Sequence, residues 1–344
     1  MTFKEFKQQY QKVPVEHYPN KVKNKPLVSV CVMTYQHKKY IKDCLDGILM
    51  QKTDFPFEIL LGEDASTDGT KEICLEYAKK YSDKIRLFLH KRENNIKYNG
   101  NPSGKFNFLY NLFNSKAEYI ALCEGDDYWN DPYKLQKQVD ILEKNNDLAM
   151  CTHETHHLHY PIGSKRTWRR AASIFYRDMQ LYGILKLTNL LSNYIFNNDK
   201  FWFQARSHGD QKRKKLLHLE DMKHGKWFIS TCSILMKREI IDPLPTCLMT
   251  IGGAHQLILF FGAMKGGIFH LKEKMAVKRD QESSVTMNKN RVIQNRKRNR
   301  NINLNVTLKR YECIKEYANE EQKKIFSRMI EEYKIKNFYS KNNT

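Results

Sequence analysis

The chain places three carboxylates within four positions, at Glu124, Asp126 and Asp127. They follow residues 117–123, a mostly apolar run that is typical of a buried strand. In an open α/β sheet, ligands bind just outside the carboxyl ends of the strands. Carboxylates at such a place can hold a hard cation such as Mg²⁺ or Mn²⁺, which takes its other ligands from water and from a substrate phosphate. A solvated acidic turn would show the same spacing, so the motif alone leaves both interpretations open.

The elements that would position this acidic stretch alternate between strand and helix. Continuous apolar runs predict strands buried on both faces, and apolar residues at helical spacing predict helices. The expected strands are residues 27–34, 57–62, 85–89 and 117–123, and the expected helices are residues 40–49, 71–81 and 105–114. This alternation predicts an α/β fold with a doubly wound, mostly parallel central sheet flanked by helices. Before the second helix, Asp68 is typical of a turn former and Thr70 of a helix N-cap.

Composition describes a folded chain that carries a strong positive charge. The 344 residues are 41% hydrophobic, which is enough for a sizeable core and excludes a disordered polymer. Lys and Arg outnumber Asp and Glu by 59 to 38, and the net charge of +21 favours an anionic partner. The positive charge would complement any of four anionic partners: a nucleotide, an acidic glycan, an anionic membrane surface or a nucleic acid. No recognisable nucleic-acid motif accompanies it, so we do not expect nucleic acid as the partner.

The cysteines and the apolar runs bear on the cellular location. Eight cysteines are scattered without a CxxC pair, which indicates buried thiols in a reducing compartment and argues against a zinc site. The charged first residues contain no signal-peptide core, and no run reaches the roughly 18 apolar residues of a spanning helix. We therefore expect a cytoplasmic protein, with peripheral attachment to the inner face of a membrane as an option.

Three motifs in chain order resemble family 2 glycosyltransferases of the GT-A fold. They are residues 28–35, then residues 63–70 (EDASTDGT), then residues 124–129 (EGDDYW). Residues 131–138 (DPYKLQKQ) resemble the subgroup in which this acidic motif leads into a helix. The resemblance covers residues 26–150 well and continues weakly to about residue 285. It implies a GT-A-like fold and a metal-dependent hexosyltransferase of polysaccharide biosynthesis, which moves a sugar from a UDP-linked donor to a glycan or lipid-linked acceptor hydroxyl with inversion.

The resemblance also implies roles for individual residues. Thr34, Tyr35 and Asp64 would line the nucleoside pocket, where the Asp64 carboxylate would accept a hydrogen bond from a base N–H. Asp126 would bind Mg²⁺ or Mn²⁺ directly, while Glu124 would reach the ribose or a metal-bound water. The residues expected near the donor phosphates are Lys105 or Lys97 and, farther along the chain, Arg279. Trp129 is more simply a wall of the donor pocket or part of the core.

The expected general base is missing from the segment that resembles its usual position. Inverting members of the family carry an Asp before an apolar helix, and the matching position here is Gly253 or Ala254. Three interpretations remain open. His255 serves as the base, a carboxylate such as Glu220 or Asp221 reaches the site, or the chain is a non-catalytic relative that binds a nucleotide or glycan.

The chain divides into four expected segments. They are a lead-in at 1–25, a nucleotide-sugar-binding half at 26–150, an acceptor-side half at 151–286 with an insertion at 163–215, and a basic helical tail at 287–344. The insertion contains an amphipathic stretch, Ile174–Phe196, predicted to be helical. That stretch and the tail could each pack on the domain or face anionic lipid.

A histidine-rich run follows residue 150 and invites a transition-metal interpretation. In an extended strand, His153 and His157 would lie roughly 13 Å apart, too far to share one ion. We therefore expect these histidines to be exposed or to form hydrogen bonds on the acceptor side.

Overall fold

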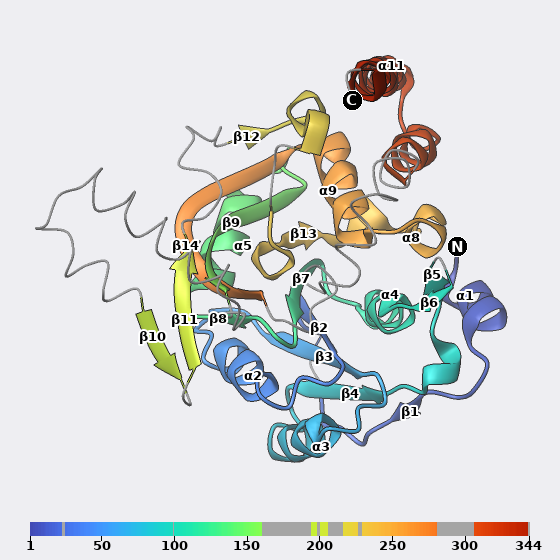
Figure 1. Ribbon diagram of the computed structural model, residues 1–344. Coiled ribbons are helices and arrows are strands. Elements are labelled where there is room, and N and C mark those ends of the chain that lie inside the picture. Colours follow the sequence, from blue (N-terminus) through green and yellow to red (C-terminus); the bar gives the residue numbers. More distant parts are fainter. Residues whose placement is uncertain are drawn as a thin grey trace, which may run out of the picture.

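The computed structural model contains an α/β domain with helices on both faces of a large sheet (Figure 1). It describes residues 1–22, 25–98, 100–159, 194–197, 200–205, 216–225, 229–280 and 306–342. Most of the amphipathic stretch expected at 174–196, and residues 287–305 of the expected basic tail, lie outside these residues.

Four parallel strands form the centre of the sheet, in the order β4-β3-β2-β7. They are β2 (Val28–Thr34), β3 (Phe57–Glu63), β4 (Ile85–Leu89) and β7 (Tyr119–Glu124). The chain builds outward from β2 through β3 to β4 and then returns to add β7 on the other side of β2. This reversal makes β2 and β7 the switch point at which ligands bind in such sheets. The predicted parallel sheet is confirmed.

The second half of the chain extends the same sheet beyond β7. The short strand β13 (Leu235–Lys237) runs antiparallel between β7 and β9 (Met150–His159), and β14 (Ile268–Asp280) runs parallel to β9. Consequently β7, β9 and β14 all end at the same edge. Strand β8 (Tyr128–Trp129) pairs with β14 and brings residues 276–277 next to the acidic stretch.

Short strands extend the large sheet at its periphery, and they are β1 (Glu16–His17), β10 (Tyr194–Asn197), β11 (Lys200–Ala205) and β12 (Leu216–Leu217). Strands β5 (Lys97–Tyr98) and β6 (Asn101–Pro102) pair with each other in a separate two-stranded sheet. The hairpin of β10 and β11 pairs with β9. Residues 194–196 are therefore strand, where the sequence predicted the end of a helix, because the ladder to β11 satisfies their backbone groups.

The helices cover the two faces of the sheet in two groups, because side chains of each strand alternate between faces. Val28, Val30 and Val32 face one group, whereas Cys31 faces the other. The first group is α2 (Ile41–Leu49), α3 (Thr70–Lys80) and α5 (Lys134–Lys144). The second group is α1 (Phe3–Tyr10), α4 (Lys105–Asn114), α8 (Cys247–Thr250), α9 (Ala254–Lys265), the helix at 306–315 and α11 (Glu320–Asn342).

Short 3₁₀ turns connect these elements. They are η1 (Arg92–Asn94), η3 (Leu219–Gly225), η4 (Thr231–Ser233) and η5 (Arg238–Ile241).

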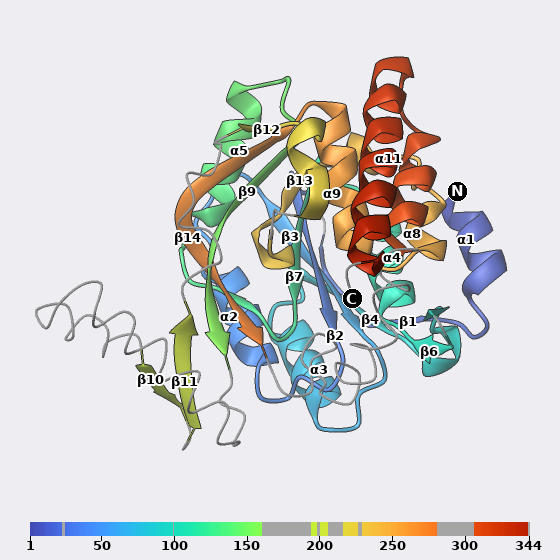
Figure 2. The same cartoon turned by 45° about the horizontal axis from the view of Figure 1, so that its top comes forward.

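The described part of the basic tail is helical, as predicted, and it packs on the domain. Its residues Tyr311, Ile314, Phe326 and Met329 are buried in the core shared with α9. Figure 2 shows α11 lying alongside α9, where Phe326 packs against Phe260. Burial of this apolar face stabilises the helix at 306–315 and α11.

Two predictions from the residues have definite outcomes. All eight cysteines lie in described segments and are free thiols, and seven of them are buried. His153 and His157 are also buried, which excludes the alternative of exposure for both and leaves the alternative of hydrogen bonding. Their rings hydrogen-bond to the Glu154 carbonyl and the Thr155 hydroxyl. Within the described residues, no helix combines the length and apolar character needed to cross a bilayer.

The start of α3 corrects one capping prediction. The helix begins at Thr70 itself, and the N-cap is Gly69, whose φ of 99° suits glycine. Asp68 accepts hydrogen bonds from the Thr70 amide at 3.0 Å and the Lys38 amide at 3.0 Å. Asp68 lies two residues before the first residue of the helix, and there its carboxylate contacts both amides. Asp68 is thus the turn former that the sequence predicted, and Thr70 is not the cap.

His90 is a buried histidine whose surroundings disfavour the protonated ring. It follows β4, is 2% exposed, and packs edge-on against the rings of Phe106 and Tyr110. Neither ring nitrogen has a hydrogen-bond partner among the described residues. Burial, aided by the charge of His17, lowers the pKa of His90 to about 3. The folded state therefore excludes a proton that the unfolded chain accepts below about pH 6.5.

We expect acidification from pH 7 to pH 5 to reduce the free energy of unfolding by about 2 kcal/mol through His90 alone. Urea unfolding at both pH values measures this loss. The His90→Leu variant should lose about 2 kcal/mol less than the wild type over the same interval. Replacing the exposed His218 by Leu is the control. Equal acid sensitivity in the His90 and His218 variants would contradict the assignment.

Candidate functional site

Three strand ends meet at one edge of the sheet and bring the predicted residues together. In the parallel register, Thr34 of β2 lies beside Glu63 of β3, and Met33 lies beside Glu124 of β7. The Asp64 amide donates to the Thr34 carbonyl at 3.1 Å, which continues the ladder one residue beyond β3. The residues expected in the nucleoside pocket and in the acidic motif therefore share one edge.

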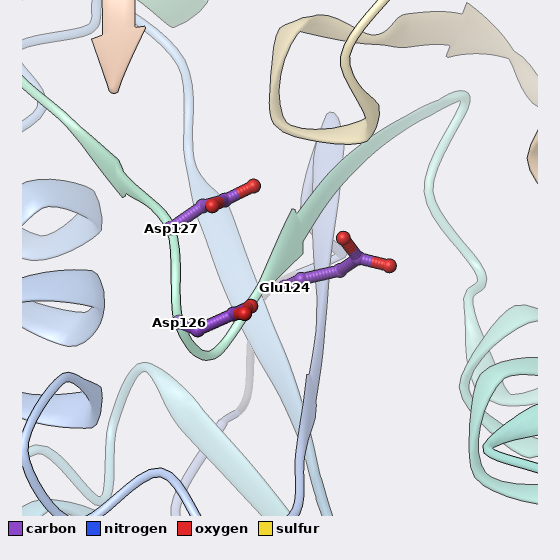
Figure 3. A group of neighbouring side chains, drawn as sticks. All are labelled: Glu124, Asp126 and Asp127. Atoms are coloured by element: carbon purple, nitrogen blue, oxygen red, sulfur yellow. The ribbon is translucent and has the colours of Figure 1, made fainter. Parts of the chain in front are cut away.

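The acidic motif forms a tight turn between β7 and β8 (Figure 3). Each of Glu124, Asp126 and Asp127 offers a carboxylate oxygen, and these oxygens all lie within 4.8 Å of one another. In Figure 3 the three side chains project to the same side of the turn. Such an arrangement concentrates negative charge and offers several hard oxygen ligands at one point.

The repulsion among these carboxylates appears in their pKa values. Burial, followed by the charge of Asp126, raises the pKa of Glu124 to about 7. The same causes raise the pKa of Asp127 well above its ordinary value. The nearby Lys278 ammonium opposes both shifts but is the weaker influence. A bound cation would remove this repulsion directly.

Asp127 provides a test of whether a cation fits. The residue is 1% exposed, and its Oδ1 accepts a hydrogen bond from the Arg279 amide at 2.9 Å. Its Oδ2 is buried and has no hydrogen-bond partner among the described residues. Buried carboxylate oxygens are costly when nothing satisfies them. An unsatisfied oxygen beside two other carboxylates fits a Mg²⁺ or Mn²⁺ ion, since both prefer oxygen ligands.

Gly125 is needed because neighbouring side chains pack against its Cα atom. A Cβ atom at this position would lie 2.7 Å from Thr34 Oγ1 and 2.8 Å from His37 Nδ1. The Gly125 amide also donates to the Met33 carbonyl at 2.9 Å. The glycine thus lets the acidic turn lie directly against the loop that follows β2.

Trp129 belongs to the core beneath the turn. It is 1% exposed, and its Nε1 donates to the Cys232 carbonyl at 2.9 Å. The buried Lys134 ammonium lies 4.0 Å from the centroid of the indole ring. The interpretation of Trp129 as core is confirmed, and its packing fixes one end of the acidic turn.

Arg279, near the end of β14, lies beside the acidic turn. Its guanidinium donates to the Asp126 carbonyl at 3.2 Å and to Asp43 at 2.5 Å. It also stacks against the Tyr128 ring, 4.3 Å from the ring centroid. These contacts hold the turn against α2. Contact with a donor phosphate stays a prediction.

The Asp64 carboxylate is held by two residues that the sequence did not single out. Arg92 forms an ion pair with Asp64, and the Asn95 amide donates to both carboxylate oxygens at 3.1 and 3.2 Å. Arg92 also lies 4.1 Å above the ring centroid of Tyr35. Burial raises the pKa of Asp64 to about 6, although Asn95 and Arg92 oppose the shift. The polar cluster directly after β4 was the available signal, because it follows a strand that ends at the same edge.

Lys105 lies at the start of α4, and its ammonium binds backbone carbonyls. The residue is 8% exposed, and its ammonium donates to the carbonyls of Met249 at 2.9 Å and Ile251 at 2.5 Å. It therefore anchors the segment before α9 to the start of α4. A contact with the diphosphate remains untested, as it does for the exposed Lys97 on β5.

The candidate general bases are separated by the fold. His255 lies in the first turn of α9, and Gly253 before it has a φ of 79°. Burial, then the charges of Arg310 and Lys278, lower the pKa of His255 to about 4. The imidazole is neutral at pH 7 and can accept a proton, though only as a weak base.

Glu220 and Asp221 lie at the other edge of the sheet. They follow β12, whose residues pair with Phe269 and Ile268 at the start of β14. Glu220 forms an ion pair with Arg328 of α11 at 2.7 Å. Since β14 begins at the edge opposite to Glu124, these carboxylates do not reach the acidic turn in this structure. The prediction that one of them supplies the base is not supported by their placement.

Known proteins share parts of this sequence. An uncharacterised protein of Mycobacterium tuberculosis is 39% identical over 153 residues, covering 43% of this chain and 42% of that protein. The putative glycosyltransferase EpsE of Bacillus subtilis is 35% identical over 120 residues, covering 35% of this chain and 40% of the relative. The chain thus spans less than half the length of these relatives.

One solved structure aligns with nearly the whole chain. It is a mannosyltransferase from Pyrobaculum calidifontis in complex with GDP-Man and Mn²⁺, with a TM-score of 0.48 and 16% identity, covering 94% of this chain and 74% of that one. The family model for glycosyl transferase family 2 matches residues 29–242, which is more than half of the chain. The protein belongs to glycosyl transferase family 2.

Proposed function

We propose that the protein transfers a sugar from a UDP-linked nucleotide-sugar donor to a hydroxyl of a glycan or lipid-linked acceptor, with inversion and with the help of Mg²⁺ or Mn²⁺. The observation that carries the proposal is the convergence of Glu124, Asp126 and Asp127 within 4.8 Å at the edge where Asp64 also lies. Family membership supports glycosyl transfer as the reaction class.

The acidic motif accounts for how the leaving group would be held. Asp126 is the proposed direct ligand of the cation, and the unsatisfied Oδ2 of Asp127 offers a second oxygen. A divalent cation supplies Lewis-acid stabilisation of the charge that develops on the departing diphosphate. Glu124, at the end of β7, is placed to orient the ribose or a water bound to the ion. Arg279 holds the turn in position through the Asp126 carbonyl.

The Asp64 pocket accounts for recognition of the base. Asp64 presents a carboxylate as acceptor, and Tyr35 presents a ring that is 40% exposed at the pocket mouth. A uracil N–H could donate to Asp64, because an ionised carboxylate only accepts. Arg92 braces both side chains, so the base would meet a fixed surface.

The acceptor hydroxyl must lose a proton when it attacks the anomeric carbon. Segment 251–259 contains no Asp or Glu, and His255 is its proton acceptor. A neutral imidazole satisfies the chemical requirement for a general base. The second candidate function, a non-catalytic nucleotide- or glycan-binding protein, rests on this same missing carboxylate together with the low pKa of His255.

Replacing Asp126 by Ala should weaken binding of UDP in the presence of Mn²⁺ by at least about tenfold, since loss of a ligand disturbs the ion's coordination. Calorimetric titration of UDP with and without Mn²⁺ measures the effect. Asp54→Asn removes an exposed carboxylate beside Phe55 and Pro56, away from the motif, and is the control. Equal Mn²⁺-dependent affinity in wild type and Asp126→Ala would overturn the metal assignment.

Uridine binding without metal should depend on the ionisation of Asp64. The pKa of Asp64 is about 6, so the carboxylate gains a proton and loses acceptor capacity as the pH falls. We expect the association constant for uridine to decrease about tenfold from pH 7 to pH 5. In Asp64→Asn it should be low and independent of pH. A wild-type affinity that does not change with pH, measured by NMR titration, would refute the acceptor role.

Turnover of the donor distinguishes the two candidate functions. We expect slow hydrolysis of UDP-glucose, UDP-galactose or UDP-GlcNAc by the wild type, and a decrease of about 100-fold in His255→Ala without a change in UDP affinity. His218→Ala, an exposed histidine, is the control. Tight UDP binding with no turnover of any donor would favour the non-catalytic function. Unchanged turnover in His255→Ala would exclude His255 as the base.

A further inference from the structure

Two helices begin side by side at the carboxyl edge of the sheet, next to the proposed donor site. Helix α4 starts at Lys105 after β4, and α9 starts at Ala254 and runs toward the beginning of β14. The bonds from the Lys105 ammonium to the carbonyls of Met249 and Ile251 join the two starts. Neither N-cap, Gly104 or Gly253, provides a side-chain hydrogen bond to its helix. Both helices thus direct the positive ends of their dipoles to this place.

Positively charged side chains gather at the same place. Arg310, from the helix at 306–315, donates through Nε to the Gly252 carbonyl at 2.8 Å and through Nη1 to the Gln256 side chain. Lys278 lies near the end of β14, close enough for its charge to act on His255, Glu124 and Asp127. We call Lys105, Lys278 and Arg310 the cationic cluster.

Lys105 and Arg310 lack the counter-charges that Arg92 and Arg279 have. Arg92 pairs with Asp64, and Arg279 pairs with Asp43. Within the described residues, neither Lys105 nor Arg310 forms an ion pair with a carboxylate. Both bind neutral oxygens of the protein, which solvate the cations but do not cancel their charge.

The charge of Arg310 affects the pKa values of the neighbouring groups. Burial, then the charge of Arg310, lowers the pKa of Lys105 to about 8. Arg310 and Lys278 together contribute to the low pKa of His255. Like charges gathered in a partly buried place are unfavourable unless an anion compensates them. The cluster therefore has the electrostatic character of an anion site.

We infer that the cationic cluster binds an anionic group, a phosphate or a carboxylate, that is carried by the acceptor. This inference rests on the proposed glycosyl transfer and adds a substrate class to it. The donor diphosphate is assigned to the acidic turn, where a cation would neutralise it, whereas the cluster lies around the start of α9. His255, in the first turn of α9, is the proposed general base. The base must lie next to the acceptor hydroxyl that it deprotonates. An anionic group bound beside His255 would therefore belong to the acceptor.

Binding of such an anion would also assist the base. A negative charge beside Arg310 and Lys278 offsets their repulsion of a protonated imidazole, and so raises the pKa of His255 from about 4. An acceptor of the right charge would thereby increase the basicity of the group that deprotonates it. A neutral acceptor would leave His255 a weak base.

The experiment uses the full chain saturated with UDP and Mn²⁺, so that the donor site is already occupied. Calorimetric titrations compare two pairs of probes, glycerol 3-phosphate with glycerol and glucuronate with glucose. We expect the anionic member of at least one pair to bind and the neutral members not to bind, with an affinity that falls as NaCl increases. Binding of glycerol 3-phosphate would indicate a phosphate site, and binding of glucuronate would indicate a carboxylate site.

Substitutions in the cluster locate the site. Arg310→Gln and Lys105→Gln should each weaken binding of the anionic probe at least tenfold, whereas Arg310→Lys, which keeps the charge, should retain most of it. Lys309→Gln removes a neighbouring exposed charge from the same helix and should have little effect. Melting temperatures of all variants show whether α9 and the tail stay folded. Comparing Arg310→Lys, which keeps the charge, with Arg310→Gln separates loss of charge from loss of packing.

Three results would overturn the inference. Anionic and neutral probes could bind alike, or the anion could bind Arg310→Gln as tightly as the wild type. Alternatively, the wild type could prefer UDP-glucuronate over UDP-glucose in an Arg310-dependent manner, which would assign the cluster to the donor sugar. Failure of UDP itself to bind the wild type with Mn²⁺ would instead contradict the proposed function, so the two failures are distinguishable.

Discussion

The mutual repulsion of three carboxylates at the end of β7 is the constraint on which the rest of the site depends. Glu124, Asp126 and Asp127 stay within 4.8 Å of one another because the turn that carries them is fixed at both ends. Gly125 lets the turn lie against the loop after β2, and Trp129 anchors it in the core. The fold thus maintains an arrangement that is unfavourable without a cation, so the proposed metal site would be prepared in advance.

The edge of the sheet separates charge by sign. The carboxylates gather at the switch point between β2 and β7, and the cationic cluster of Lys105, Lys278 and Arg310 gathers where α4 and α9 begin. Lys278 acts on both sides, since its charge opposes the raised pKa values of Glu124 and Asp127 and contributes to the low pKa of His255. In the proposed reaction, a cation would compensate one side and an acceptor anion the other, so donor and acceptor would meet where the opposite fields adjoin.

Sequence reasoning succeeded where a residue's role follows from its own strand or turn. The apolar runs predicted the parallel strands, and Asp68 was correctly interpreted as a turn former. Sequence reasoning was wrong, or made no prediction, where the role of a residue depends on contacts with segments distant in the chain. Arg92 joins Asp64 only because β3 and β4 are neighbours, and Lys105 binds carbonyls more than 140 positions away. Glu220 and Asp221 remained candidates for the base until strand pairing placed them at the opposite edge. Thr70 was misassigned by one residue, because the N-cap is Gly69, whose positive φ shows only in the backbone geometry.

By itself, the sequence determined the order of strands and helices, the chemical types at the strand ends, and through its three ordered motifs the family. These are local properties, since apolar periodicity and turn chemistry act over a few residues. Only the tertiary structure decided which charges face one another. It placed Arg279 of β14 against the turn after β7, and brought Arg310 of the last segment to the start of α9. Electrostatic interactions depend on distance in space and on burial, and neither can be read along the chain.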